Sequence, residues 1–258
     1  MKTITSKFDL KGRVAIVTGS SKGIGKSIAR GLAENGARVV VSSRKQEAVD
    51  AVASEFREAG LEAAGIACHV GDGGQRKALV EKTLARYGQV DILVNNAAIN
   101  PYYGPLEGSE EGVFDKIMEV NVKAPWMLSN LVLPHMKAQG GGSIINISSV
   151  EGIRPGFGLG LYSATKAALI MLTKNQAKEW GRHGVRANVV CPGLVKTKFS
   201  QGLWSDETLV KHFTKALPLG RIADADEMAG VVLLLASDAG SYMTGGVYTA
   251  DGGYLVSG

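Results

Sequence analysis

The chain has few of the residues that build disulfide frameworks or zinc sites. Among 258 residues there are only two cysteines, Cys68 and Cys191, and both lie inside apolar runs. No CxxC motif occurs, and the four histidines are widely separated in the chain. This pattern predicts no metal site and argues against the Cys/His ligand set of a zinc alcohol dehydrogenase. Buried free thiols in a reducing compartment are the simplest interpretation of the two cysteines.

Long apolar runs and basic clusters are also missing. No stretch is long and apolar enough to span a membrane, and the polar segment 1–13 lacks the apolar centre of a signal peptide. The formal net charge of +5 is spread along the chain without a Lys/Arg block. That distribution argues against a nucleic-acid surface and suits an anionic cofactor. We therefore expect a cytoplasmic protein that acts on a small molecule and binds neither a membrane nor nucleic acid.

Short apolar runs rich in β-branched residues alternate with segments of helical periodicity. The hydrophobic content of 45% suits one large domain. Near-continuous apolar strands spaced by helices indicate a parallel sheet covered on both faces. We predict an α/β fold, a single doubly wound Rossmann domain over residues 1–258 with a mostly parallel seven-stranded sheet. The predicted strands are 13–18, 38–43, 62–70, 90–97, 142–149, 185–193 and 245–253.

Chemically distinctive groups follow the predicted strands. In a doubly wound sheet, ligands bind beyond the carboxyl ends of the strands. Loops are commonly polar and rich in glycine, which explains part of the pattern, but not why each strand end carries a distinctive group. These groups are Gly19–Gly25, Ser43–Arg44, His69–Asp72, Asn95–Ala98, Ser148–Ser149 and Pro192–Gly193.

The segment TGSSKGIG (18–25) predicts a phosphate-binding turn. It follows a strand and opens a helix, and its glycines at 19, 23 and 25 let the backbone turn tightly and approach a pyrophosphate. The amides at the helix N-terminus would then face the negative charge. The segment lacks the Gly-Lys-Ser/Thr ending of an ATP-type loop, which argues against a phosphotransferase.

The second predicted strand indicates the type of dinucleotide. NAD-binding proteins usually place an acidic residue there to hold the ribose hydroxyls, whereas this strand runs VVVSSRK without one. Ser43 and Arg44 offer a hydroxyl and a guanidinium to a 2′-phosphate, and Lys22 adds a charge from the glycine turn. The alternative is a solvated Lys and Arg at a helix start. The missing acid favours NADP(H), with NAD(H) as the alternative.

A tyrosine and a lysine, Tyr162 and Lys166, lie one helical turn apart in YSATK. By itself the pair fits an ordinary helix whose tyrosine packs on the core and whose lysine reaches water. The alternative is a catalytic pair, in which a cation lowers the phenol pKa from about 10 by about one to three units. The groups that follow the other strands favour the catalytic interpretation.

The motifs together resemble the short-chain dehydrogenase/reductase family. The matching segments occur in the family's order and cover nearly the whole chain. Within the family, VVVSSRKQ (39–46) and CHVG (68–71) are most similar to NADP-dependent carbonyl and retinal reductases, followed by some bacterial sugar-alcohol dehydrogenases. The matching segments are TGSSKGIG (18–25), NNAA (95–98), VNV around Asn121, SS (148–149), YSATK (162–166), PG (192–193) and DGG (251–253).

The resemblance implies a catalytic tetrad of Asn121, Ser149, Tyr162 and Lys166. Tyr162 would be the general acid in reduction and the base in oxidation, and Lys166 would lower its pKa and hold the nicotinamide ribose. Ser149 lies at the family spacing before Tyr162 and would hold the substrate oxygen, with Ser148 as the less favoured candidate. Asn121 would sustain a water-linked proton relay to Lys166.

The resemblance also implies a set of dinucleotide-binding residues. The family often carries Asp at the end of the third strand to contact adenine, and His69 stands there instead, so that the Val70 backbone would serve. The implied residues are Gly19, Ser21, Lys22, Gly23, Ile24, Gly25, Ser43, Arg44, His69, Val70, Asn96, Ala97, Ala98, Tyr162, Lys166, Pro192, Gly193, Val195 and Thr197.

The substrate pocket reads as mixed in polarity. Residues 194–218 predict a lid, in which Phe199, Leu203 and Trp204 form an apolar roof or, alternatively, pack on the core. Tyr102 and Tyr103 suit a pocket wall. Glu151 either orients a hydroxyl group or faces water. An apolar ketone and a polyol both remain candidate substrates.

We therefore expect an enzyme that uses NADP(H) to reduce a ketone or aldehyde to an alcohol, or the reverse, with a Tyr proton donor. The first alternative is an NAD-dependent sugar-alcohol or secondary-alcohol dehydrogenase. The second is a non-catalytic dinucleotide sensor, against which the intact tetrad argues. Family members are usually tetramers, and the apolar C-terminal segment 245–258 suits an interface in a homotetramer.

Overall fold

The computed structural model describes residues 3–205 and 207–257, so that residues 1–2, 206 and 258 of the predicted domain lie outside the described residues. A seven-stranded sheet runs through the centre in the order β3-β2-β1-β4-β5-β6-β7, and every neighbouring pair is parallel. The predicted doubly wound α/β fold is therefore confirmed. The strands are β1 (Val14–Thr18), β2 (Arg38–Ser42), β3 (Ala63–Gly65), β4 (Ile92–Asn95), β5 (Gly142–Ile147), β6 (Val185–Pro192) and β7 (Val247–Ala250).

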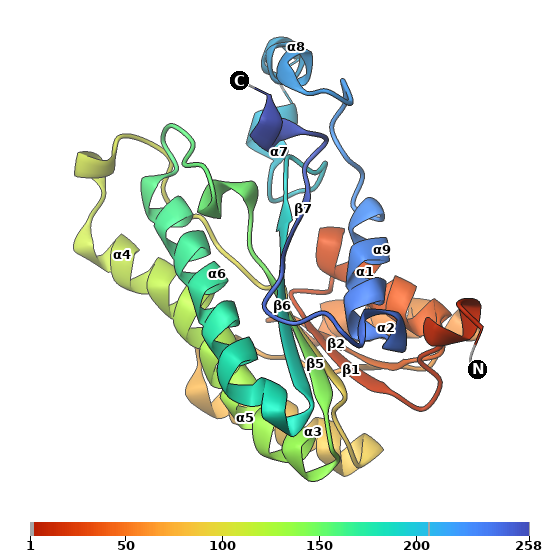
Figure 1. Cartoon of the computed structure of the whole chain (residues 1–258). Helices are drawn as coiled ribbons and strands as arrows, with labels where there is room; N and C mark the ends of the chain where they lie inside the picture. Colours follow the sequence, from red (N-terminus) through yellow and green to blue (C-terminus); the bar gives the residue numbers. More distant parts are fainter. Residues whose placement is uncertain (1–2, 206, 258) are drawn as a thin grey trace.

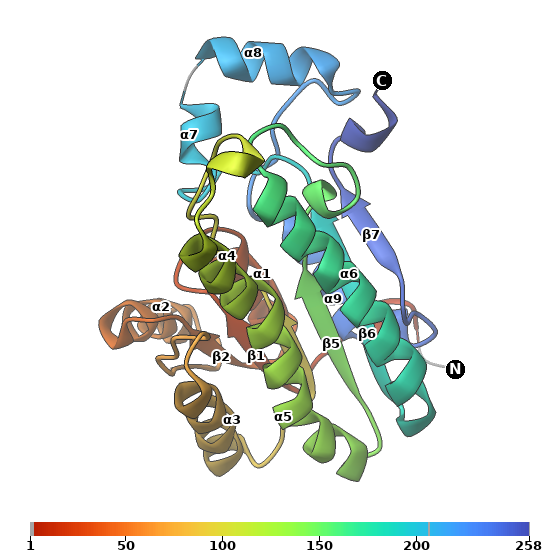
Figure 2. The ribbon, with the colours of Figure 1, turned by 90° about the vertical axis from the view of Figure 1, so that its left-hand side faces the viewer.

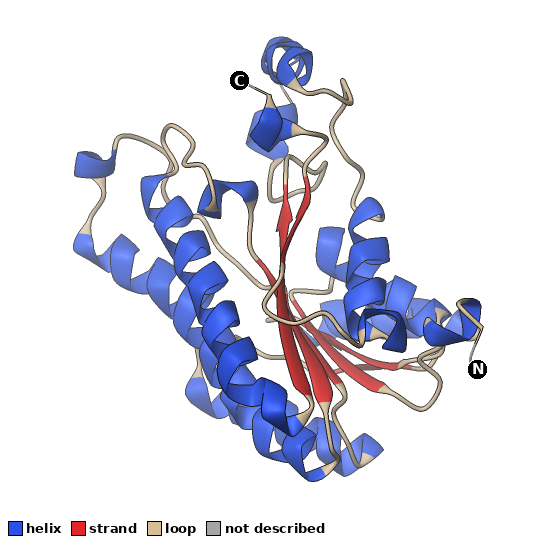
Figure 3. Cartoon of the chain, in the orientation of Figure 1, coloured by secondary structure: helices blue, strands red, loops and turns tan. Residues whose placement is uncertain are grey.

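Helices cover both faces of the sheet. In Figures 1 and 3, α1, α2 and α9 lie on one face and α3, α4, α5 and α6 on the other. Among the described residues, no helix is long and apolar enough to cross a membrane. The helices are α1 (Gly23–Glu34), α2 (Gln46–Glu58), α3 (Gly73–Tyr87), α4 (Glu111–Met118), α5 (Ala124–Ala138), α6 (Gly160–Trp180), α7 (Gln201–Trp204), α8 (Glu207–Ala216) and α9 (Glu227–Ala236).

The hydrophobic core has two halves, one on each face of the sheet. Successive side chains of a strand pack into opposite halves. Val39 and Val41 of β2 pack with α1, α2 and α9, whereas Val40 between them packs with residues of α3 and α5. All three are fully buried. This follows from the strand period of two, which sends successive side chains to opposite faces. Because both faces are covered, side chains of both parities are mostly apolar, and the sequence shows nearly continuous apolar runs.

The third strand is shorter than the predicted segment 62–70. It ends at Gly65, and the chain beyond it follows β2 irregularly, with the Ile66 N–H donating to the Val41 carbonyl (3.0 Å) and the Cys68 N–H to the Ser43 carbonyl (2.8 Å). The apolar residues beyond Gly65 are buried, so the hydrophobic pattern continues after the regular strand has ended. Hydrophobic periodicity reports burial, which is why it overestimated this strand at the sheet edge.

Buried polar side chains form a hydrogen-bond network between the sheet and helices that cover one of its faces, α5 and α6. The Asn95 side chain donates to Oδ1 of Asn146 (2.8 Å), and the Asn146 amide donates to Thr173 Oγ1 (2.8 Å) and Gln176 Oε1 (3.2 Å). All four residues are buried. The network ties β4 and β5 to α6, the helix that carries Tyr162, because a buried polar group without a partner is costly.

We expect Asn146→Ala to lower the free energy of unfolding by about 2–4 kcal/mol, because it leaves several buried polar groups without partners and opens a cavity. Chemical denaturation followed by circular dichroism measures the loss. Asn175→Ala, on the exposed side of α6, is the control and should change stability by less than about 0.5 kcal/mol. Equal stability of the two variants would contradict this account of the network.

Candidate active site

The carboxyl ends of β1, β4, β5 and β6 lie side by side at the same end of the sheet, beneath α7 and α8 (Figure 2). The parallel register places Val17 beside Val94 and Ile147 beside Val190. The strand order reverses between β1 and β4, and such a reversal opens a crevice for a ligand. The groups that follow these strands in the sequence are thus brought to one edge.

The turn after β1 is held by the end of β4. Oγ1 of Thr18 accepts from the N–H groups of Asn96 (3.0 Å) and Ala97 (3.1 Å), and the Asn96 side chain donates to the carbonyls of Thr18 (2.9 Å) and Gly19 (3.2 Å). A Cβ atom at Gly25 would lie 2.4 Å from Asn96 Nδ2, so only glycine fits there. The Asn96 side chain therefore holds the turn. Thr18 was missed, because a threonine at a strand end has no distinctive sequence signal.

The N-terminus of α1 offers uncompensated positive charge. Lys22 is its N-cap, no side chain caps the first amides, and the first turn holds no acidic residue. Lys22 and Arg44 are exposed, and neither forms an ion pair within residues 3–205 and 207–257. Ser43 lies half-buried next to Arg44. The glycine turn is joined to the end of β2, because the Ser20 N–H donates to the Ser42 carbonyl at 3.0 Å. Uncapped amides and cations in two neighbouring segments fit a phosphate.

In the loop after β3, the His69 side chain stabilises the turn of its own loop. Nδ1 of His69 accepts from the Gly71 N–H (3.1 Å), and the exposed ring lies outside the core. Val70 is buried, and its carbonyl accepts from the Arg76 guanidinium. The His69 side chain thus shapes the loop, while Arg76 holds Val70 in place.

The segment after β6 crosses towards the glycine turn. Pro192 is the last residue of β6, and Gly193 packs closely against the backbone of Asp251. Val195 is buried and forms a parallel bridge with Ala223. Thr197 lies beside Gly23, where an added Cβ would be 3.3 Å from the Thr197 methyl group. Thr197, which is far from the glycine turn in the sequence, therefore lies against that turn.

Ser149, Tyr162 and Lys166 form a cluster between β5 and α6. The side chains of Ser149 and Tyr162 are hydrogen-bonded. The Lys166 Nζ atom lies 5.4 Å from the centroid of the Tyr162 ring and donates to the Ile147 carbonyl at 2.9 Å. The i, i+4 spacing puts Tyr162 and Lys166 on one face of α6. Ile147 is a functional partner that sequence reasoning could not find, because it acts through its backbone.

The structure distinguishes the two adjacent serines. Ser148 is buried, and its hydroxyl donates to the Lys166 backbone carbonyl at 2.8 Å. Ser149 is half-buried and bonds to Tyr162. Ser148 therefore anchors α6, and Ser149 alone of the two presents its hydroxyl to Tyr162.

Asn121 lies in a π-helical turn, η3 (Glu119–Lys123), between α4 and α5. Its side chain accepts from the Ile99 N–H (2.9 Å) and donates to the Ile99 carbonyl (2.9 Å) and Thr165 Oγ1 (3.1 Å). Asn121 is buried. Single π-turns inside helices occur frequently at functional sites. Here the turn joins the end of β4 to the helix that carries Tyr162.

The expectation that Lys166 lowers the pKa of Tyr162 is wrong for the chain by itself. Burial raises the pKa of Tyr162 above its ordinary value; the Ser149 hydrogen bond opposes this rise, and the negative charge of Glu151 adds to it. Burial also lowers the pKa of Lys166 from 10.5 to about 8. Desolvation disfavours the charged form of both groups and is the largest cause of each shift. At neutral pH the phenol thus keeps its proton.

The segment after β6 reaches Tyr162. The Phe199 ring lies 6.2 Å from the Tyr162 ring, measured between centroids. Nε1 of Trp204 donates to the Thr197 carbonyl (2.7 Å), which ties α7 to the segment after β6. Leu203 is largely exposed, and residue 206 of the predicted lid lies outside the described residues.

The two tyrosines of the loop after β4 differ in their contacts. The Tyr102 hydroxyl donates to the Pro105 carbonyl at 2.8 Å and so closes its own loop. Tyr103 is exposed and lies against Gly158, and the Gly104 N–H donates to the Gly158 carbonyl at 3.0 Å. The loop after β4 therefore packs on the loop that precedes α6.

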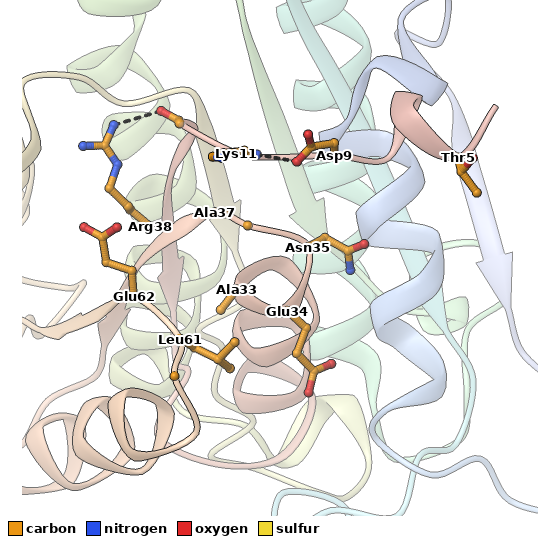
Figure 4. A pocket seen from close by; sticks show the side chains of 13 residues that line it. Thr5, Asp9, Lys11, Ala33, Glu34, Asn35, Ala37, Arg38, Leu61 and Glu62 are labelled. Carbon is orange, nitrogen blue, oxygen red and sulfur yellow. Dashed lines mark hydrogen bonds between the residues drawn. The ribbon is translucent and has the colours of Figure 1, made fainter. Parts of the chain in front are cut away.

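A separate pocket of about 790 Å³ lies at the other end of the sheet, where β1, β2 and β3 begin. Figure 4 shows it between the end of α1 and the start of β2, lined by Glu34, Arg38 and Glu62 among others. None of the clustered residues of α6 borders it. Within the part of the chain that the structure describes, no three His, Cys, Asp or Glu side chains gather in a way that could hold a metal ion.

Comparison with known proteins finds similarity over almost the entire chain. A family model described as "Enoyl-(Acyl carrier protein) reductase" matches residues 19–255. "Dehydrogenase/reductase SDR family member 4" of Oryctolagus cuniculus is 43% identical over 250 residues, which cover 97% of this chain and 96% of the relative. The Homo sapiens protein of the same name is 41% identical over 97% of this chain and 90% of its own length.

Solved structures share the fold at similar identity. A gluconate 5-dehydrogenase from Burkholderia cenocepacia J2315, in complex with NADP and tartrate, superposes with a TM-score of 0.93 at 37% identity, covering 97% of this chain and 98% of that chain. A short-chain type dehydrogenase/reductase from Mycobacterium marinum gives a TM-score of 0.91 at 34% identity, covering 98% and 99%.

The low pKa of Lys166 predicts a pH-dependent stability. Below pH 8 both the folded and the unfolded chain bind this proton, and the buried cation costs stability. As pH rises from 8 to 10.5, only the unfolded chain keeps the proton, so the folded state gains about 3 kcal/mol. We expect Lys166→Met to melt at a higher temperature than the wild type at pH 7, and this advantage to disappear by pH 10.5.

Differential scanning fluorimetry across this pH range measures the effect. Lys178→Met, at an exposed position of the same helix, is the control and should follow the wild type at every pH. A Lys166→Met protein that is less stable than the wild type at pH 7 would show that the ammonium is not destabilising in the folded chain.

Proposed function

We propose, because the chain belongs to the short-chain dehydrogenase/reductase family, that this oxidoreductase uses NADP(H) to interconvert a ketone or aldehyde and the corresponding alcohol. The observation that carries the proposal is the cluster of Ser149, Tyr162 and Lys166 at the carboxyl edge of the sheet. The glycine turn after β1 lies at the same edge. A proton donor and a dinucleotide groove that share one edge are what this reaction class requires.

Each residue of the cluster has a separate role at the substrate oxygen. A bound nicotinamide dinucleotide would supply the hydride in reduction and accept it in oxidation. Tyr162 donates a proton to the oxygen as negative charge develops there, and the Ser149 hydroxyl donates a hydrogen bond to the same oxygen. Lys166 places its charge behind the Tyr162 ring, and Asn121 holds α6 through Thr165.

The raised pKa of Tyr162 supports reduction as the direction that the chain favours. A phenol that keeps its proton at neutral pH acts as an acid without prior protonation. The alcohol-oxidising direction needs the phenolate, which burial and Glu151 disfavour. Oxidation should therefore become faster at alkaline pH.

The preference for NADP(H) rests on the cations beside the glycine turn. Lys22 and Arg44 are exposed; Lys22 precedes α1 in the glycine turn, and Arg44 follows β2, which ends without an acidic residue. A 2′-phosphate needs such cations, whereas the ribose hydroxyls of NAD(H) need an acceptor. The similar gluconate 5-dehydrogenase was solved with NADP, which supports the same choice here.

An NAD-dependent sugar-alcohol or secondary-alcohol dehydrogenase is the second candidate. The structural similarity to a gluconate 5-dehydrogenase favours a polyol over an apolar ketone. Phe199, beside Tyr162, favours an apolar group instead. A non-catalytic dinucleotide sensor ranks below both, because sensing does not require a proton donor.

We extend the proposal to a homotetramer in the cytoplasm. Tyr242 and Val256, near the C-terminus, are almost fully exposed apolar residues, as expected of a surface that another copy covers. Cys68 and Cys191 are buried free thiols, which suits a reducing compartment.

We expect Tyr162→Phe to lower kcat for carbonyl reduction by about 10²–10⁴-fold, because the variant has no proton to donate. Binding of NADPH should stay close to the wild-type value, since the glycine turn is unchanged. Steady-state kinetics and nicotinamide fluorescence measure the two effects, with Tyr242→Phe as the surface control. Retained turnover in Tyr162→Phe would refute the assignment of the proton donor.

We expect the wild type to bind NADPH more tightly than NADH, and Arg44→Ala to weaken NADPH binding about 10- to 100-fold with little effect on NADH. A fluorescence titration with each dinucleotide tests this, and Lys45→Ala, the exposed neighbour, is the control. If the wild type binds NADH equally well or better, the loop after β2 does not bind a phosphate. Secondary alcohols and polyols with NAD would then be the substrates to screen.

A further inference from the structure

The carboxylate of Glu151 lies near the cluster of Ser149, Tyr162 and Lys166. Glu151 is half-buried in the short helix η4 (Val150–Gly152), two residues after Ser149. Its backbone N–H donates to Ser149 Oγ at 3.1 Å. Within residues 3–205 and 207–257 it forms no ion pair. A half-buried acidic side chain without a cationic partner, next to a reacting group, calls for an explanation.

Close packing holds Glu151 in position. The next residue, Gly152, lies so near α6 that an added Cβ would be 2.6 Å from the Lys166 carbonyl carbon. The Glu151 carboxylate accepts from the Gly156 N–H and, at 3.3 Å, from the Ser163 hydroxyl. Ser163 is the neighbour of Tyr162. The carboxylate therefore lies over the first turn of α6, in the wall beside the reacting phenol.

The negative charge of Glu151 reaches the reacting group. It is one of the causes that raise the pKa of Tyr162, and burial raises the pKa of Glu151 as well. The two groups are therefore close enough for the charge of Glu151 to act on the Tyr162 hydroxyl. A substrate oxygen bound against Ser149 and Tyr162 would lie within reach of the same charge.

The carboxylate has room for one more donor. Two oxygens offer about four acceptor positions, of which the Gly156 N–H and the Ser163 hydroxyl occupy two. A hydroxyl or ammonium group of a substrate can occupy another. A substrate carboxylate at the same place offers no donor, and two like charges close together repel strongly.

We propose that Glu151 selects substrates with a hydroxyl or ammonium group on the carbon next to the reacting carbonyl, and excludes substrates with a carboxylate there. This inference rests on the proposed carbonyl reduction by Ser149 and Tyr162. Glu151 is thus a specificity-determining residue in the wall of the site.

Three ketones that share a benzoyl group test the selection. These are 2-hydroxyacetophenone with a hydroxyl group, propiophenone with a methyl group in its place, and phenylglyoxylate with a carboxylate. The wild type should reduce the hydroxyketone with at least about tenfold higher kcat/KM than propiophenone, and phenylglyoxylate more slowly still. Glu151→Gln keeps the shape and one acceptor but removes the charge. It should raise kcat/KM for phenylglyoxylate about tenfold or more and reduce the preference for the hydroxyketone.

Two control variants separate charge from structure. Glu110→Gln removes an exposed carboxylate from the neighbouring loop and should leave all three ratios unchanged. Ser163→Ala removes a hydrogen bond to Glu151 but keeps the charge, so the discrimination against phenylglyoxylate should persist. Binding of NADPH, measured by fluorescence, verifies that each variant is folded.

The outcomes distinguish the inference from the proposed function. If the wild type reduces none of the ketones or a panel of aldehydes, the proposed function fails, and the inference fails with it. If the wild type is active and Glu151→Gln leaves the ratios unchanged, only the inference fails. Inhibition of the wild type provides a test without any variant, because 1-phenyl-1,2-ethanediol should bind at least about tenfold more tightly than mandelate. Equal inhibition by the two would overturn the inference.

Discussion

The burial of the Lys166 ammonium at the end of β5 is the constraint on which the rest of the site depends. Within the described part of the chain, the ammonium donates a hydrogen bond to one backbone carbonyl, that of Ile147, so its position is set by packing. Ser148 bonds the carbonyl of the same lysine, and Gly152 packs against it. These contacts fix the start of α6 against β5. Tyr162, one turn earlier, is thereby placed beside Ser149.

The charge balance of the cluster follows from its low exposure to water. Desolvation raises the pKa of Tyr162, lowers the pKa of Lys166 and raises the pKa of Glu151. A lysine and a tyrosine that attract each other in water would show a lowered phenol pKa and a raised ammonium pKa. The shifts of Tyr162 and Lys166 have the opposite directions. The site is therefore prepared to give a proton to an oxygen on which charge develops, and it resists a second negative charge.

Most polar side chains at the edge of the sheet are engaged in holding loops. Thr18 and Asn96 fix the glycine turn, and Asn121 joins the π-helical turn to Ile99 and Thr165. In the described part of the chain, Lys22 and Arg44 stand apart from this pattern, with exposed charges and no ion pair. Groups left without protein partners at a strand edge are the ones available to a ligand.

The sequence by itself determined the parallel sheet, the glycine turn and the Tyr162–Lys166 pair, because hydrophobic period, turn geometry and helical spacing depend on neighbours in the chain. It also specified the cations Lys22 and Arg44. Only the tertiary structure decided that β3 ends at Gly65, which serine faces Tyr162, and that the pKa of Tyr162 rises. Burial and hydrogen-bond partners come from segments far apart in the sequence, and these set the energies of charged groups.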